Sequence, residues 1–274
     1  MKRLFAALLA GMMLLSACGA QAQQQAIATQ GALLTTPLQT TPAPTTPQPT
    51  TPQPTTTEPP KLLIVIDPGH QAKGNYDREP IGPGAEETKA KVSSGTQGCV
   101  TGLAEYELNL AVALKLRQEL EQRGYRVILT RESHDVNISN SQRAAIANEA
   151  QADAFIRIHA NGSENPNASG AMTICQTPNN PYNGHLYSQS YALSECVLDS
   201  MVASTGCRRE RVWQTDTMSG INWCAVPATI VEMGYMSNPE EDRLLSQEDY
   251  QWKLAKGIAD GIDRYFAAQE DQPS

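Results

Sequence analysis

From residue 61 onward, short apolar runs alternate with longer segments in which apolar residues recur every three or four positions. The short runs, rich in Val and Ile, predict strands, and the longer periodic segments predict helices. Strands are expected at residues 62–66, 125–130, 154–158, 171–175 and 228–232. Helices are expected at residues 105–123, 140–150, 183–205 and 250–266, with one more beginning near Pro239.

This alternation predicts the fold class. Successive strand–helix–strand units form an α/β domain, here a single domain with a mostly parallel or mixed twisted sheet and helices on both faces. Residues 61–267 are expected to form this domain and residues 268–274 a tail. A long Gly-containing stretch at residues 71–101 follows the first strand without a regular pattern. We expect it to be a structureless insertion that borders a substrate groove.

The first 24 residues have the pattern of an export signal. Lys2 and Arg3 precede roughly a dozen apolar or small residues, a run too short to span a bilayer. Leu15-Ser16-Ala17-Cys18 resembles the lipobox of bacterial lipoproteins, in which the cysteine is acylated and becomes the N-terminus. Residues 1–18 are thus predicted to be a lipoprotein-type signal peptide. The protein is then expected to be exported and anchored through Cys18 to a membrane, facing the periplasm or the outer cell surface. The alternative is a plain secretory signal in which Cys18 has no role.

Residues 19–60 are predicted to be a disordered Thr/Pro/Gln-rich linker. Thr-Thr-Pro-Gln-Pro occurs at residues 45–49 and again at 50–54, and the composition cannot supply a hydrophobic core. Such a tract favours the extended polyproline II conformation at about 3.1 Å per residue. Residues 35–60 would then reach roughly 80 Å, enough to lift a domain away from a membrane.

The charge balance argues against one class of partner. The formal net charge is −8 and the chain has no cluster of Lys and Arg. Because neutralisation of phosphates supplies most of the affinity for nucleic acids, no nucleic-acid partner is expected. Five cysteines lie beyond the linker, none in a Cys-x-x-Cys pair, so a structural zinc site is not expected. In an exported protein some of them are expected to form disulfides, and Cys196–Cys207 is the first candidate because the two flank the end of a predicted helix.

Three polar residues that can bind metal or move protons lie where apolar runs end. His70 follows the first strand, His159 ends the run Phe155-Ile156-Arg157-Ile158, and Glu232 ends the run Ala228-Thr229-Ile230-Val231. In α/β sheets ligands bind beyond the carboxyl ends of the strands, so these three side chains are expected to converge.

A further acid lies at the start of the helix predicted at 105–123. Glu105 and Glu107 are about 200° apart around a helix and cannot both face one metal ion, and periodicity alone does not choose between them. Two histidines and one glutamate form a zinc site that keeps a position open for water, and a second glutamate can then act as general base. This pattern predicts a metal-activated hydrolase. His134 and His185 lack the strand-end context and are interpreted as ordinary histidines, although His185 is a candidate for lining the groove, and Asn161 is expected to cap a turn.

Four segments resemble the zinc-dependent N-acetylmuramoyl-L-alanine amidase family of bacterial cell-wall hydrolases. They are Val-Ile-Asp-Pro-Gly-His (65–70), Glu-Tyr-Glu-Leu-Asn-Leu (105–110), Ile-His-Ala-Asn-Gly (158–162) and Ile-Val-Glu-Met-Gly-Tyr-Met-Ser-Asn (230–238), and Leu129-Thr130-Arg131 and Arg143 also fit. The resemblance extends from about residue 62 to 266.

The resemblance implies a site and an activity. One zinc ion would be bound by His70, Glu105 and His159, which settles the choice of Glu105 over Glu107, and Glu232 would be the catalytic glutamate. The implied reaction is cleavage of the amide bond between N-acetylmuramic acid and L-alanine in peptidoglycan by zinc-activated water. Two alternatives stay open: a catalytically silent peptidoglycan-binding lipoprotein module, and a zinc peptidase of the stem peptide. The sequence does not identify a protein activator.

Overall fold

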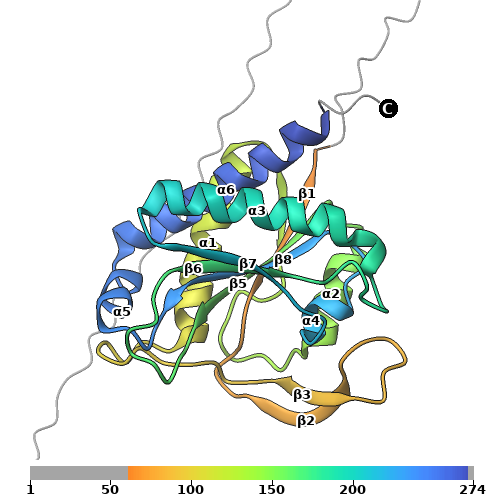
Figure 1. Ribbon diagram of the computed structural model, residues 1–274, viewed down its shortest axis with the longest axis horizontal. Helices are drawn as coiled ribbons and strands as arrows, with labels where there is room; N and C mark the ends of the chain where they lie inside the picture. Colours follow the sequence, from red (N-terminus) through yellow and green to blue (C-terminus); the bar gives the residue numbers. More distant parts are fainter. Residues whose placement is uncertain (1–60, 271–274) are drawn as a thin grey trace, which may run out of the picture. The chain divides into compact units, whose positions relative to one another are not determined.

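A six-stranded sheet forms the centre of residues 61–270, the part of the chain that the computed structural model describes (Figure 1). The strand order is β4-β1-β5-β8-β6-β7. Four neighbouring strands are parallel: β4 (Arg126–Leu129), β1 (Leu63–Pro68), β5 (Ala154–Asn161) and β8 (Ala228–Tyr235). The next strand, β6 (Ala171–Cys175), is antiparallel to β8, and β7 (Arg209–Gln214) is parallel to β6. The expected mixed, mostly parallel sheet is confirmed.

Helices cover both faces of this sheet, as predicted. One face is covered by α1 (Glu105–Gln122), α3 (Tyr187–Thr205) and α6 (Glu248–Glu270), which share the largest apolar core with the strands. The other face is covered by α2 (Asn140–Glu149) and the short α4 (Ser219–Asn222) over a smaller core that includes Phe155. A 3-10 turn, η1 (Gly184–Leu186), precedes α3, and α5 (Pro239–Leu245) connects β8 to α6. None of the helices in residues 61–270 has the length and apolar character needed to cross a membrane.

Local sequence signals explain several helix ends. The Ser139 hydroxyl accepts a hydrogen bond from the backbone N–H of Gln142, which caps α2. Asn238 caps α5 in the same way, with Pro239 at the first helical position. Helix α3 ends at Gly206, whose φ of 74° suits glycine. Helix α6 runs to Glu270, three residues beyond the expected end of the domain at residue 267.

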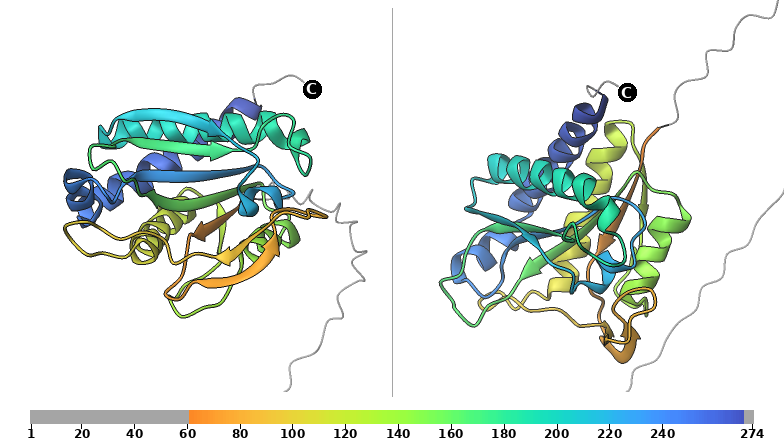
Figure 2. Two further views of the ribbon diagram at one scale, coloured as in Figure 1. Left: turned by 60° about the horizontal axis from the view of Figure 1, so that its bottom comes forward. Right: turned by 45° about the vertical axis from the view of Figure 1, so that its right-hand side comes forward.

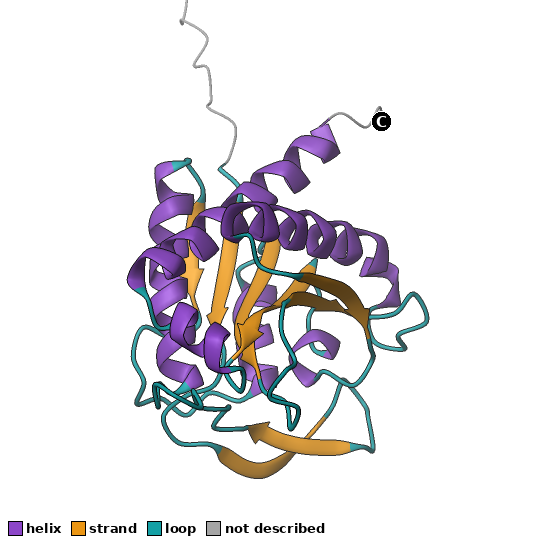
Figure 3. Ribbon diagram, turned by 60° about the vertical axis from the view of Figure 1, so that its left-hand side comes forward, coloured by secondary structure: helices purple, strands orange, loops and turns teal. Residues whose placement is uncertain are grey.

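The expectation of a structureless insertion at residues 71–101 is wrong. This stretch contains an antiparallel hairpin of β2 (Asn75–Pro80) and β3 (Thr88–Val92). Most of its side chains are half-buried or exposed and few are apolar, so no apolar alternation marks the strands in the sequence. Strand β3 contacts α2, and Figures 2 and 3 show the hairpin beyond the end of the sheet to which the central parallel strands point. Strand β7 was also missed, since it is an edge strand with mostly exposed side chains.

The expected disulfide between Cys196 and Cys207 is not formed. All five cysteines of residues 61–270 are free thiols. Cys196 lies in the middle of α3, which continues to Thr205, and at about 1.5 Å rise per residue the helix separates the two by more than 10 Å. A disulfide requires Cα atoms within about 7 Å. The predicted signal peptide, Cys18 and the linker at 19–60 lie outside the described residues.

Candidate metal centre

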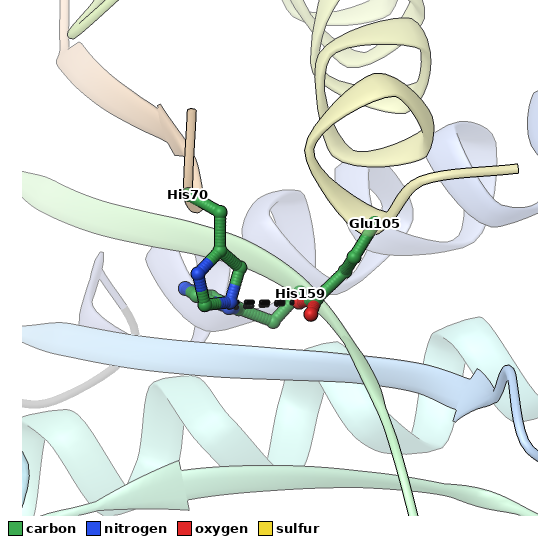
Figure 4. A group of neighbouring side chains, drawn as sticks. All are labelled: His70, Glu105 and His159. Atoms are coloured by element: carbon green, nitrogen blue, oxygen red, sulfur yellow. Dashed lines mark hydrogen bonds and ion pairs between the residues drawn. The ribbon is translucent and has the colours of Figure 1, made fainter. Parts of the chain in front are cut away.

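Three side chains from separate elements meet beyond the carboxyl ends of β1 and β5. His70 follows β1, Glu105 is the first residue of α1, and His159 lies near the end of β5 (Figure 4). Glu105 Oε1 is 3.1 Å from His70 Nε2 and 3.2 Å from His159 Nδ1, and the two imidazole nitrogens are 3.1 Å apart. One ligand atom from each side chain lies within 4.8 Å of the others. The sequence-predicted ligand set is therefore assembled in the fold.

The donor chemistry of this cluster fits a divalent metal ion. His70 donates its Nδ1–H to the carbonyl oxygen of Ser93 at 2.9 Å, which orients the ring so that Nε2 faces Glu105. Burial lowers the pKa of His159 to about 4, with partial compensation from Glu105, so this imidazole is neutral at pH 7. Burial alone would raise the pKa of Glu105, but hydrogen bonds from His159 and His70 hold it well below its usual range. A neutral imidazole and an ionised carboxylate are the forms in which histidine and glutamate bind metal.

The backbone around His70 adopts an uncommon conformation that two buried arginines hold in place. His70 has a φ of 61°, in the left-handed region that few residues other than glycine adopt. Arg131 donates to the carbonyl oxygens of Pro68 at 2.8 Å and Gly69 at 3.0 Å. Arg143 donates to the carbonyls of Pro68 at 2.9 Å and His70 at 3.0 Å. These bonds satisfy the carbonyls that the turn takes out of the sheet.

The same turn depends on a fully buried acid that the sequence analysis did not single out. Asp67 accepts hydrogen bonds from Arg143 Nη1 at 2.7 Å, Arg157 Nε at 2.8 Å and the Thr130 hydroxyl at 2.5 Å. Burial alone would raise the pKa of Asp67, but Arg143 and Arg157 hold it well below its usual range. The sequence signal for this role was a carboxylate directly after the apolar run 62–66, in the turn that leads to His70. A buried acid requires partners.

Contacts with Gly69 and Asn109 fix the positions of His159 and Glu105. A Cβ atom at Gly69 would overlap the His159 ring, so only glycine leaves room for that imidazole beside the turn. Asn109, one helical turn after Glu105, donates from its side-chain nitrogen to Glu105 Oε1 at 3.3 Å and to the Gly69 carbonyl at 3.2 Å. Asn109 therefore ties α1 to the turn that precedes His70, a role that its position four residues after Glu105 makes possible.

Glu232 lies beside the cluster. It pairs with His159 in the register of β5 and β8, and one of its carboxylate oxygens, Oε2, is buried without a hydrogen-bond partner in residues 61–270. Burial, and then repulsion from Glu105, raise the pKa of Glu232 to about 8 although Arg157 opposes the shift. Two cavities, of about 440 and 600 Å³, meet at His70, His159 and Glu232. Glu232, the fourth predicted site residue, thus lines both cavities beside the cluster of His70, Glu105 and His159.

The remaining candidates have structural roles. Glu107 is exposed, and its carboxylate accepts from the backbone N–H of Ala104 at 3.2 Å at the start of α1. The Asn161 side-chain oxygen accepts from the Gly162 N–H at 2.9 Å, which supports the turn interpretation. His134 packs edge-on against Tyr106, and His185 lines neither of the two cavities.

Comparison with known proteins identifies relatives along most of the chain. Residues 64–264 match the protein family described as N-acetylmuramoyl-L-alanine amidase. The N-acetylmuramoyl-L-alanine amidase LytC of Bacillus subtilis is 30% identical over 203 residues, which cover 74% of this chain but only 35% of LytC. The solved structure of the amidase Ami1 from Mycobacterium smegmatis has a TM-score of 0.68 at 26% identity, covering 76% of this chain and 98% of that one. The structure of the CwlD amidase from Clostridioides difficile in complex with the GerS lipoprotein has a TM-score of 0.61 at 25% identity, covering 76% and 100%.

Proposed function

This chain belongs to the N-acetylmuramoyl-L-alanine amidase family, and on that premise we propose that it hydrolyses the amide bond between N-acetylmuramic acid and L-alanine in peptidoglycan. The observation that carries the proposal is the convergence of two histidines and a glutamate with a second glutamate, whose Oε2 is buried and has no hydrogen-bond partner in residues 61–270. A metal site with a free carboxylate beside it is the constellation that amide hydrolysis by activated water requires.

We assign the metal as one zinc ion, held by His70 Nε2, His159 Nδ1 and a carboxylate oxygen of Glu105. Two imidazoles and a carboxylate form a zinc set that keeps a coordination position open. When bound, zinc supplies Lewis acidity that lowers the pKa of water toward neutrality and polarises the amide carbonyl. The support for zinc is the ligand chemistry and the neutral state of His159.

The protein's own contribution is proton transfer and positioning. Glu232 Oε2 accepts a proton from the attacking water as the water oxygen bonds to the lactyl carbonyl carbon. The same carboxylate oxygen then delivers that proton to the leaving nitrogen of L-alanine as the C–N bond breaks. The products are the free lactyl carboxylate of muramic acid and a peptide that begins with L-alanine. The raised pKa of Glu232 suits a group that must both take and return a proton near neutral pH.

We also propose that the protein acts outside the cytoplasm, with residues 61–267 as the catalytic domain. The cell-wall substrate of the amidase family and the lipobox-like Leu15-Ser16-Ala17-Cys18 support export and a lipid anchor at Cys18. A Thr/Pro/Gln-rich linker at residues 19–60 suits an enzyme that must reach from a membrane to the wall. Metabolic labelling with a fatty-acid analogue, compared with Cys18→Ser, tests the anchor: label on the wild-type protein alone is expected.

Digestion of purified peptidoglycan by the zinc-loaded protein tests the activity. Mass spectrometry should find free stem peptides that begin with L-alanine, and Glu232→Gln should release them at least about a hundredfold more slowly. Fragments cut within the stem peptide would identify a zinc peptidase instead. Binding to the wall without any product would favour the catalytically silent module, unless a protein partner added from extracts of the source cells restores the release of stem peptides.

A further inference from the structure

The two cavities that meet at the metal centre differ in charge. The cavity of about 440 Å³ lies between the β2–β3 hairpin and the segment around α4, and three cationic side chains line it: Arg78, Lys89 and Arg157. The cavity of about 600 Å³ on the other side is lined by Thr96, Asn161, Ser163 and Ser237 among others, and by no Lys or Arg. The groove is therefore basic on one side of the reacting centre and uncharged or acidic on the other.

The hairpin cations that line the cavity, Arg78 and Lys89, have no carboxylate partner within residues 61–270. Lys89 Nζ donates to the carbonyl oxygen of Thr217 at 2.8 Å, which holds the ammonium at the cavity and leaves two of its protons for another acceptor. Arg78 donates to the hydroxyl and carbonyl oxygens of Thr88, and both of these acceptors are neutral. By contrast, Lys91, two residues after Lys89, pairs with Asp77 at 3.3 Å and does not line this cavity.

The third cation belongs to the cavity wall. Arg157 is buried, and its Nε and Nη2 donate to Asp67 and Asn140. Its remaining nitrogen, Nη1, has no hydrogen-bond partner in residues 61–270. A Cβ atom at Gly220 would overlap this nitrogen, so glycine there leaves the guanidinium its place beside the cavity. A guanidinium nitrogen in the cavity wall with no acceptor in residues 61–270 is available to an acceptor on a ligand.

We propose that this hairpin-side cavity is a carboxylate-binding subsite that takes the stem peptide next to the scissile amide. The proposal depends on the proposed function. In a muramyl peptide the second residue is glutamate linked through its side-chain carboxyl, so its main-chain carboxylate is the free acid nearest to the bond to be cut. Three cations in a chain of net charge −8 favour such a local anion and give no general attraction for polyanions. The apolar side chains of Met218 and Ile230 in the same cavity suit the alanine methyl group.

This assignment also orients the substrate. The peptide extends toward the hairpin, and the sugar strand lies over the cavity lined by Asn161 and Ser163, whose amide and hydroxyl groups suit sugar hydroxyls. The hairpin then distinguishes a free from an amidated main-chain carboxyl on the peptide's second residue. Carboxylate and carboxamide have the same shape but differ by one charge.

Binding of two matched ligands tests the subsite without turnover. The ligands are N-acetylmuramoyl-L-alanyl-γ-D-glutamyl-L-lysinamide and its counterpart in which the glutamate main-chain carboxyl is amidated, so that the side-chain carboxyl is in amide linkage in both. Isothermal titration calorimetry on the zinc-loaded, full-length Glu232→Gln protein should show about tenfold tighter binding of the free acid, because a hydrogen bond to a charged group contributes on this scale. Adding Lys89→Met should reduce the preference to nearly one, and Lys89→Arg should retain it.

Lys91→Met in the same background is the matched control. It removes the same charge from the same strand outside the cavity, so the tenfold preference should persist. Equal affinity for the two ligands in the Glu232→Gln protein, an unchanged preference in Lys89→Met, or no binding of either ligand would each overturn the subsite. Failure of the proposed function is a separate result, since wild-type protein would then release no L-alanine-terminated peptide whichever ligand its cavity prefers.

Discussion

His159 and Glu232 occupy paired positions on the neighbouring parallel strands β5 and β8. Residues paired in register project from the same face of a sheet, so the backbone itself places the Glu232 carboxylate beside the ligand histidine. The two residues therefore have different roles. His159 is part of the ligand cluster, whereas Glu232 is outside it and has an unpartnered oxygen.

This separation predicts that Glu232→Gln removes turnover without removing the metal. The amide cannot accept the proton of water, so the rate of release of stem peptides should fall by about 10²- to 10⁴-fold. Metal content per chain, measured by plasma mass spectrometry after dialysis, should equal that of the wild type. Loss of the metal in this variant would show that Glu232 acts as a ligand.

Glu105→Gln should have the opposite signature. Replacing the carboxylate removes the one anionic member of the ligand cluster, so we expect metal affinity to fall by at least about tenfold, measured by competition with a chelating dye. Glu107→Gln is the matched control, because Glu107 lies in the same helical turn but is exposed. It should bind metal as the wild type does and lose at most about 1 kcal/mol of stability from the weakened helix start.

Gly69→Ala tests whether the space beside His159 matters for the site. The new Cβ would overlap the His159 ring, so the imidazole must move and metal affinity should fall. Gly84→Ala provides the comparison, since Gly84 has a φ of 76° but no atom within 4 Å of an added Cβ. It should cost about 1 kcal/mol of backbone strain and leave metal binding unchanged. Equal metal affinity in both variants would contradict this interpretation.

Asp67→Asn should destabilise the domain in a pH-dependent manner. Removing the charge leaves Arg143 and Arg157 buried without their anion, which costs about 3–5 kcal/mol at pH 7. The pKa of Asp67 is lower in the folded than in the unfolded state, so its stabilising contribution is complete above about pH 4 and is lost as the pH falls further. Urea unfolding of both proteins at pH 7, 5 and 3.5 should therefore show a constant difference down to pH 5 and a smaller one at pH 3.5.

The free cysteines predict a stability that does not depend on reductant. The unfolding temperature of the protein should be the same with and without dithiothreitol. Alkylation of the native protein by iodoacetamide at pH 8, followed by peptide mass spectrometry, should modify exposed Cys99 first. Cys175 and Cys224 should react only after unfolding, because both are buried and burial raises the pKa of each thiol to about 11. Early modification of Cys224 would contradict the packing described for it.

The central strands could be predicted from the sequence because their side chains are buried and therefore apolar. β1, β5 and β8 are apolar along most of their length, and this pattern also located His70 after β1 and His159 near the end of β5. Glu232 was expected at the end of its strand, but β8 continues to Tyr235 and Glu232 lies within it. The choice of Glu105 over Glu107 was different. It came from the family resemblance, because the orientation of a helix start is set by contacts far away in the sequence, such as the hydrogen bond that the Ala160 N–H donates to the Glu105 carboxylate.

The pattern of apolar residues could not predict the hairpin or the buried polar residues that support the site, for physical reasons. β2 is mostly exposed and β3 mostly half-buried, so no periodic pattern of apolar residues marks them and backbone pairing defines them. Arg157 was placed in the strand predicted at 154–158 and Asp67 was given no role, yet the two form a buried ion pair at 2.8 Å. Pairing of residues 90 positions apart has no signature in one sequence, since either residue alone has the character of a surface charge.

The three residues of the metal centre belong together only in the finished fold. Glu105 and His159 are 54 residues apart in the chain, and His70 and His159 are 89 apart. An unfolded chain offers these side chains no common site, so an ion that binds them binds the folded domain alone. At a free concentration one hundredfold above its dissociation constant, such an ion adds about 2.7 kcal/mol to the free energy of unfolding. Scarcity of metal would then reduce the lifetime of each molecule as well as its activity, because a copy that loses its ion also becomes an easier substrate for proteases.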